Sequence, residues 1–172
     1  MGPKGLGPTF RVLPFVLGFW ALAAGPVSAG GFDPALREAL ERSRYVYIQS
    51  QRPDGTFGRK AEIWYHFDGE SVWVASSAKS YRVRRIRSGR TAARIFVGRP
   101  DGPSFEAEGR VVVDPAREAE LLSVFSRKYS ADWGRWEEAF RRGFASGERV
   151  LVRYGPKEVP PGDEKEEPRE RR

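Results

Sequence analysis

Hydroxyl and cationic side chains lie close together near the middle of the sequence. Ser76 and Ser77 end an apolar run, and a group of cations follows them: Lys79, Arg82, Arg84, Arg85 and Arg87. Small polar residues cap helices, and a capped N-terminus offers free N–H groups and a positive dipole end to anions. The pattern therefore predicts a short basic helix, capped by Ser76-Ser77, with a phosphate site at its start. The alternative is that these cations cover the solvated face of an ordinary helix.

The sequence lacks the residues that several other kinds of catalytic or metal site require. The chain has no cysteine, which excludes disulfides, thiolate metal sites and cysteine nucleophiles. Its single histidine, His66, argues against a zinc site or a serine-type triad, and we expect it to be structural. The net charge of +7 suits an anionic partner. Because no nucleic-acid reading motif accompanies that charge, we expect a phosphorylated small ligand and no nucleic acid.

The elements next to the cationic group read as strands. Residues 61–67 alternate apolar and polar side chains, the period of a strand with one buried face. Asp68-Gly69 then predicts a tight hairpin turn into a second strand over residues 71–75. A third strand is expected after the basic helix, over residues 92–97. The predicted order is therefore two strands joined by a tight turn, the short basic helix and a third strand.

The rest of the mature chain supplies further strands and three helices. Strands are predicted over residues 45–51, 105–113 and 148–154, so that six strands in this order favour an antiparallel barrel. Asp33-Pro34 and Asp114-Pro115 predict helix starts, with helices to about Arg42 and about Tyr129. A last helix, residues 133–144, carries aromatic side chains that form either core or dimer contacts or a ligand-binding face: Trp133, Trp136, Phe140 and Phe144.

Both termini have compositions of their own. Residues 1–29 have the cations, the apolar run and the Val27-Ser28-Ala29 site of a signal peptide, with cleavage expected after Ala29. We therefore expect export by the general secretory route and no membrane span after cleavage; an uncleaved N-terminal anchor is the alternative. Residues 30–155 would form the folded domain. Residues 156–172 are charged and nearly without apolar side chains, which predicts a disordered tail.

Between about Glu38 and Tyr154, the order of these segments resembles the pyridoxamine 5′-phosphate oxidase-like flavin split barrels. The resemblance rests on the strand at 45–51 and on the runs PDGTFGRKAEIWYHFDGESVWVAS, SYRVRRIRSGRTAARIFVG and FEAEGRVVVD, with a helix ending RKYSADW. It implies a mainly β fold with flanking helices, a six-stranded antiparallel split β-barrel. It also implies a homodimer that binds FMN, or a deazaflavin analogue, in a cleft between its subunits.

The resemblance also implies which residues contact the cofactor. Ser76 and Ser77 fall where strand-end hydroxyls meet the phosphate, and Arg82 falls where a phosphate-binding lysine is usual. Lys60, Ala61, Glu62 and Ile63 match the strand that edges the ring system. Glu62 departs from the threonine, serine or proline of many relatives. The implied cofactor-binding set is Lys60, Glu62, Ile63, Ser76, Ser77, Arg82 and Arg85.

Two functions follow from these expectations. The first is an exported oxidoreductase that transfers hydride through FMN or a deazaflavin. The substrate-binding residues of true pyridoxamine phosphate oxidases are not found, so that particular activity is not expected. No catalytic acid or base is assigned, and Tyr65 and His66 are only near the implied ring site. The second is an exported split-barrel binding or interaction protein without redox turnover, for which haem is one conceivable ligand.

Overall fold

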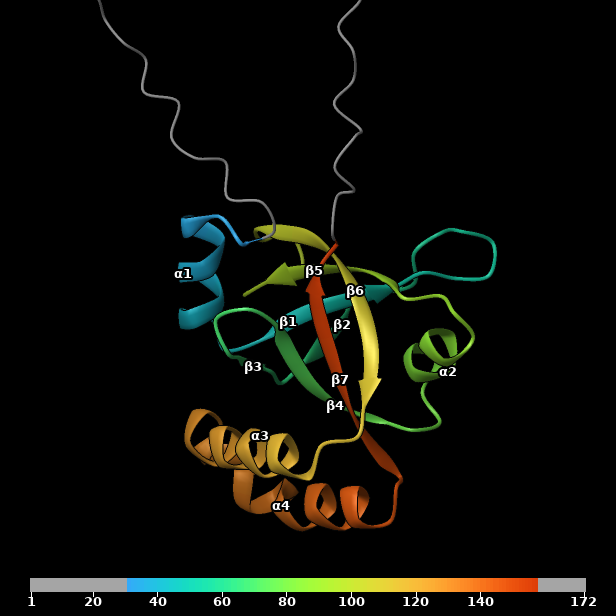
Figure 1. The fold of residues 1–172 in the computed structure, drawn as a ribbon. Coiled ribbons are helices and arrows are strands. Elements are labelled where there is room, and N and C mark those ends of the chain that lie inside the picture. Colours follow the sequence, from blue (N-terminus) through green and yellow to red (C-terminus); the bar gives the residue numbers. More distant parts are fainter. Residues whose placement is uncertain (1–30, 158–172) are drawn as a thin grey trace, which may run out of the picture.

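A computed structural model of the protein describes residues 31–157, which form seven strands and four helices (Figure 1). Four segments are helical: α1 (Pro34–Arg42), α2 (Tyr81–Arg87), α3 (Pro115–Lys128) and α4 (Ser130–Ala145). The strands are β1 (Val46–Ser50), β2 (Ala61–Ile63), β3 (His66–Phe67), β4 (Val72–Ser77), β5 (Ala92–Val97), β6 (Ser104–Val112) and β7 (Arg149–Pro156).

The strands form one antiparallel sheet in the order β2-β1-β5-β6-β7-β4-β3. Its two outermost strands, β2 and β3, are consecutive in the chain and are separated only by Trp64 and Tyr65. A residue spans at most about 3.6 Å of extended chain, so these two edges must lie close together. The sheet therefore curls into a barrel with a seam between β2 and β3, which confirms the predicted antiparallel split barrel.

The single strand predicted over residues 61–67 is wrong, because the chain leaves the sheet at Trp64 and Tyr65. The backbone N–H of Tyr65 donates to the hydroxyl of Tyr129 at 2.9 Å instead of to a neighbouring strand. The buried Tyr65 hydroxyl in turn donates to the carbonyls of Leu40 and Ser43. These bonds fix the seam, and the interruption explains why the barrel has seven strands where six were predicted.

Aliphatic side chains fill the barrel. They come from alternate positions of β1, β4, β5 and β7, such as Val46, Ile48, Val74 and Ile95. Helices α1 and α2 lie on two sides of the sheet (Figure 1) and add Leu36, Leu40, Val83 and Ile86 to the same core.

A second, aromatic core lies outside the barrel, where α3 and α4 cover the sheet (Figure 1). Trp73 and Leu151 extend from the outer faces of β4 and β7 into this layer. The helices contribute Leu121, Leu122, Phe125, Tyr129, Trp133 and Phe140. The aromatic residues of the predicted last helix therefore act mainly as core, except that Trp136 remains 41% exposed.

The helix starts agree with the predictions in two cases and differ in two, of which α4 begins at Ser130, before the predicted Trp133. Asp33 and Asp114 cap α1 and α3, each accepting backbone N–H bonds with its side chain. The cap predicted at Ser76-Ser77 is wrong: Ser80 caps α2 and accepts from Val83 N, while Ser76 and Ser77 complete β4. The strand continues because both residues pair with β7. A phosphate site at the α2 start therefore loses its predicted basis.

The predicted signal peptide and most of the predicted tail lie outside the described residues. Strand β7 ends at Pro156, two residues later than predicted, and Lys157 N donates to the carbonyl of Glu106. Within residues 31–157, no helix has the length and apolar character needed to cross a membrane.

Candidate functional site

An aromatic pocket of about 280 Å³ opens where β2 and β4 meet the helical layer. We call it the aromatic pocket, and its lining residues are Glu62, Ile63, Trp64, Ala75, Phe125, Trp136, Phe140 and Arg149. Most of these side chains are apolar, with one carboxylate and one guanidinium. Concave, largely apolar cavities with a few polar groups are the usual form of small-molecule sites.

Stacked rings hold the wall of this pocket in place. Trp64 stacks on Tyr129 with centroids 4.2 Å apart and ring planes 5° apart, and on Phe140 at 5.8 Å and 17°. Phe125 meets Trp64 edge-on. Tyr129 is itself anchored at the seam, because its hydroxyl donates to the carbonyl of Arg44. The interruption of the strand therefore also orients the tryptophan that faces the pocket.

Arg149, the first residue of β7, carries the cation of the aromatic pocket. Its Cζ lies 4.2 Å from the centroid of the Phe140 ring. Partial burial lowers the pKa of Arg149. Within residues 31–157 the Arg149 side chain makes no hydrogen bond or ion pair. A partly desolvated cation without a carboxylate partner favours the approach of an anion.

A second cavity, the basic hollow, adjoins the first and has a volume of about 330 Å³. Its lining residues are Ser77, Lys79, Ala139, Arg142, Gly143, Glu148 and Arg149. Arg142 is paired with Glu138 at 2.9 Å, whereas the Lys79 side chain has no bonded partner in the described part of the chain. Arg149 lines both cavities. Together they could receive a planar ring that bears an anionic group.

Glu62 brings a carboxylate to the lining of the aromatic pocket. The Tyr47 hydroxyl donates to its Oε2 at 2.6 Å, across the β1–β2 pair in which the two residues are partners. This hydrogen bond from the tyrosine to Glu62 raises the pKa of Tyr47. The bond holds the Glu62 carboxylate as a fixed hydrogen-bond acceptor.

The two predicted phosphate-binding serines lie on opposite faces of β4, because successive strand residues point to opposite sides. Ser77 lines the basic hollow. Ser76 is buried, and its Oγ accepts a hydrogen bond from Nη1 of Arg82 at 3.1 Å. The structure thus brings Ser76 and Arg82 together but separates them from Ser77.

The predicted cations do not converge on one point. Burial lowers the pKa of Arg82. Among the described residues, neither the buried Nε of Arg82 nor the buried Tyr154 hydroxyl has a hydrogen-bond partner. Arg85 donates to the carbonyl and hydroxyl of Ser50 at the end of β1. Lys60 lies 3.7 Å from the centroid of the Phe96 ring and donates to the Pro100 carbonyl. Of the predicted set, Glu62 and Ile63 line the aromatic pocket and Ser77 lines the hollow.

The two residues named near the implied ring site lie outside both cavities. Tyr65 is buried at the seam, and burial raises its pKa. His66 Nε2 faces Glu120 of α3 at 3.4 Å. Among the described residues, no group of His, Cys, Asp and Glu side chains could hold a metal ion.

Sequence reasoning missed the cation that links the two cavities. The aromatic spacing of α4 does allow a ligand-binding face, and Trp136 and Phe140 line the pocket. Arg149 has no comparable local signal, since it is a single cation at a strand start. Only the packing of β7 against α4 brings it to the pocket.

Comparisons with known proteins bear on the fold. No known family profile matches the sequence, and no curated protein matches it. Among solved structures, the conserved hypothetical protein Rv2991 of Mycobacterium tuberculosis is similar with a TM-score of 0.56 and 19% identity, over 76% of this chain and 84% of that one.

Two further solved structures share the architecture. A Listeria innocua protein, provisionally assigned as a pyridoxamine 5′-phosphate oxidase, has a TM-score of 0.53 and 15% identity, over 72% of this chain and 91% of its own. The haem storage protein HutZ of Vibrio cholerae has a TM-score of 0.52 and 12% identity, over 74% of this chain and 91% of its own. This chain therefore has the split-barrel fold of the pyridoxamine 5′-phosphate oxidase-like proteins.

Proposed function

We propose that the protein binds a phosphorylated flavin, FMN or a deazaflavin analogue, and acts as a flavin-dependent oxidoreductase. The ring system would lie in the aromatic pocket and the phosphate in the basic hollow. The observation that carries the proposal is the position of Arg149, which lines both cavities. Export and a homodimer, expected from the sequence, belong to the same proposal.

The residues of the two cavities fit such a ligand. Trp64 and Phe140 line the pocket with aromatic carbon that a planar ring can contact, and offset or edge-on contacts between aromatic groups are favourable. Lys79 and Arg149 offer cations whose side chains have no hydrogen-bond or ion-pair partner within residues 31–157. Charge-assisted bonds to phosphate are roughly twice as strong as neutral ones. Anion binding here would relieve the desolvated charge of Arg149.

A bound flavin or deazaflavin would supply the hydride transfer. The residues of this chain would bind and orient it. Trp64 and Phe140 would keep water from the ring faces they cover, and Lys79 and Arg149 would hold the phosphate. Glu62, fixed by Tyr47, would accept a hydrogen bond from an N–H group at the ring edge. A carboxylate at this place disfavours ligands that present only acceptors there.

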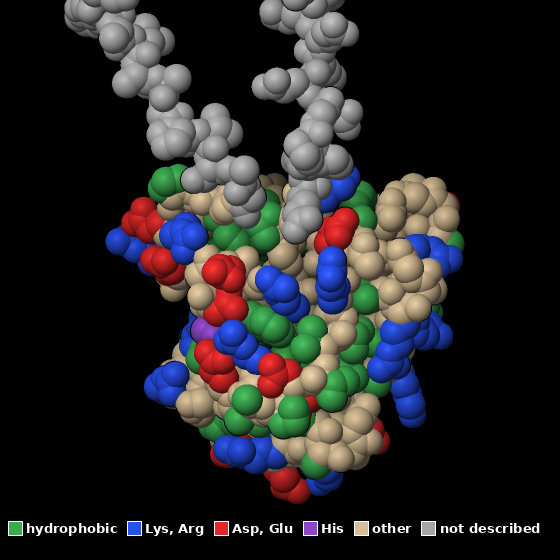
Figure 2. Space-filling model, in the orientation of Figure 1, with side chains coloured by type: hydrophobic (Ala, Val, Ile, Leu, Met, Phe, Trp, Pro, Cys, Tyr) green, Lys and Arg blue, Asp and Glu red, His purple; other side chains and the backbone are tan. Residues whose placement is uncertain are grey.

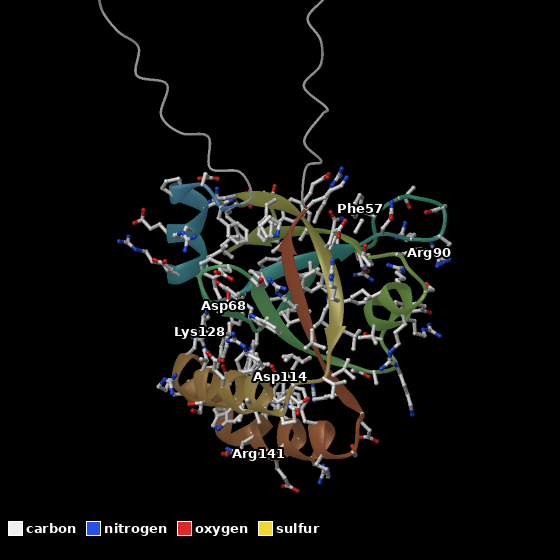
Figure 3. The ribbon with its side chains drawn as sticks, in the orientation of Figure 1. Phe57, Asp68, Arg90, Asp114, Lys128 and Arg141 are labelled. Atoms are coloured by element: carbon white, nitrogen blue, oxygen red, sulfur yellow. The ribbon has the colours of Figure 1, made fainter. Side chains whose placement is uncertain are left out.

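The test is a titration of the purified full-length protein with FMN, followed by flavin fluorescence. We expect wild type to bind and Arg149→Ala to bind about tenfold more weakly or worse, as loss of a hydrogen bond to a charged group implies. Arg141→Ala is the matched control: it removes an exposed α4 arginine that pairs with Glu137 (Figure 3). Failure of wild type to bind either FMN or a deazaflavin would overturn the proposal.

Redox turnover separates the two functions that the sequence left open. If the protein is an oxidoreductase, the bound flavin is reduced by an added hydride donor and reoxidised by an acceptor, with the protein present in catalytic amount. Binding without turnover against a panel of donors would instead support a split-barrel binding protein. The same purified protein serves both measurements.

A further inference from the structure

Gly143 of α4 lies directly beneath the side chain of Arg149. A Cβ added at Gly143 would stand 2.7 Å from Cγ and 2.8 Å from Cδ of Arg149. Non-bonded carbons prefer separations of about 3.5–4.0 Å. The aliphatic stem of Arg149 therefore crosses α4 where the helix carries no side chain.

Glycine at this position is unfavourable for the helix itself, since only proline is a poorer helix former. Its φ is not in the left-handed region, so the turn geometry of α4 does not require glycine. Gly134, in the same helix, has no atom within 4 Å of the Cβ position. Gly134 is exposed, whereas Gly143 is buried and the Arg149 side chain packs on it.

The contact decides where the Arg149 charge lies. With its stem against Gly143, the guanidinium stacks over Phe140 and reaches both cavities. Any side chain at position 143 would lift the stem and would also project into the basic hollow, which Gly143 lines. The guanidinium would then move off the Phe140 ring.

We propose that Gly143 is a positioning residue: by holding Arg149 between the two cavities, it makes the site select planar ligands that bear an anionic group over neutral ligands with the same ring. This rests on the proposed function, because the ring is taken to lie in the aromatic pocket. The ligand class is defined by its chemistry, a fused aromatic ring joined to a phosphate.

The selectivity test compares FMN with riboflavin, which has the same ring and no phosphate, on the full-length protein. We expect wild type to prefer FMN by about tenfold or more, and Arg149→Ala and Gly143→Ala each to lose that preference. The double variant should lose no more than either single variant, since both changes act through one guanidinium. Gly134→Ala should keep the preference. A Gly143→Ala variant that still prefers FMN as wild type does would overturn the proposal.

Melting temperatures without ligand test the contact independently of any flavin. Gly143→Ala should lower the melting temperature when Arg149 is present and leave it unchanged or raise it in the Arg149→Ala background, where the clash is gone. Equal losses in both backgrounds would overturn the positioning role. Coupled melting temperatures in a protein that binds no flavin would overturn the ligand assignment and, with it, the proposed function.

Discussion

Within residues 31–157, two groups of cations could face a ligand, and their side chains are bonded differently. In α2, Arg82 donates to Ser76 and Arg85 donates to Ser50, so both guanidinium groups tie the helix to strands. Near α4, Lys79 and Arg149 make no such bonds within residues 31–157 and line the basic hollow. Figure 2 shows Lys and Arg side chains gathered over α2, where the sequence is most basic.

The density of charge along a sequence therefore does not identify a binding site. A short amphipathic helix that packs on a barrel must place some of its arginines over strand ends, where they satisfy backbone and hydroxyl oxygens. The available cations come instead from separate elements, the β4–α2 connection and the start of β7.

Among these variants, we expect the largest change in stability from a substitution of Arg85. Arg85→Ala removes two partly buried hydrogen bonds to Ser50, and we expect the free energy of unfolding to fall by about 2 kcal/mol. Urea denaturation measures this change. FMN affinity should stay within a factor of about two of wild type, because Arg85 lines neither cavity.

The matched control for Arg85 is Arg84, which removes one charge from the same helix. Arg84 is exposed and stacks on the exposed Tyr81, with Cζ 4.6 Å from the ring centroid. Its loss should change stability by less than about 0.5 kcal/mol. If Arg85→Ala weakened FMN binding and left stability unchanged, Arg85 would be a ligand-binding cation. The phosphate would then have to be assigned to α2 and not to the basic hollow.

Lys128 is a half-buried cation that, unlike Lys79 and Arg149, has a hydrogen-bond partner. Figure 3 places it at the end of α3. Its Nζ lies 3.5 Å from the centroid of the Tyr65 ring and donates to the Tyr65 carbonyl. Burial lowers the pKa of Lys128 to about 8 from 10.5. Unlike Arg149, it lies at the seam and lines neither cavity.

This shift predicts how stability depends on pH. Between pH 8 and 10 the unfolded chain keeps the Lys128 proton while the folded chain releases it, so stability rises with pH, by about 1 kcal/mol after allowing for solvent screening. Above pH 10 the raised pKa values of Tyr65 and Tyr129 reverse the trend, since the unfolded tyrosines ionise first. The midpoints of urea denaturation between pH 7.5 and 10 measure the predicted rise in stability.

Lys128→Met is the comparison for that pH series. It keeps the length of the side chain over Tyr65 and removes the titrating group, so the rise between pH 8 and 10 should flatten. A rise of equal size in the variant would show that other groups produce it.

Most of the fold was predictable because it follows from local patterns. Asp33-Pro34 and Asp114-Pro115 specify helix starts through side-chain caps, and the turn at Asp68-Gly69 follows from a glycine with φ of 96°. The alternation in residues 61–67 predicted a strand correctly at both ends. It failed at Trp64 and Tyr65, where a hydroxyl from Tyr129, distant in sequence, replaces a strand partner.

The candidate site was less predictable for the same physical reason. The resemblance gave Glu62, Ile63 and Ser77, which lie on strands whose register follows the sequence pattern. It also gave Arg82 and Arg85, but whether a cation faces a ligand or a strand end depends on tertiary packing. Ser76 illustrates the limit: it neighbours Ser77 in sequence, yet the pleat turns it to the other face.

A smaller effect is expected at Lys79, whose exposed ammonium is a weaker phosphate contact than Arg149. Lys79→Ala should weaken FMN binding roughly threefold at low salt, with stability unchanged. The difference from wild type should shrink as ionic strength rises, because exposed charges are screened beyond about 8 Å at physiological salt. Titrations at two salt concentrations measure it. A loss as large as that of Arg149→Ala would mean that the hollow, not the shared arginine, dominates anion binding.

Gly134 belongs to α4 but lines neither cavity. Gly134→Ala fills open space in α4, so we expect the free energy of unfolding to rise by about 0.5 kcal/mol from helix propensity alone. FMN affinity should not change, because the added methyl group contacts neither cavity. Urea denaturation and the flavin titration check both statements. Altered affinity in Gly134→Ala would show that a stiffer α4 moves Phe140 and Arg149 together. In that case the helix as a whole would determine the positions of the Phe140 ring and the Arg149 guanidinium. The effect of Gly143→Ala could then no longer be assigned to the contact between residue 143 and Arg149.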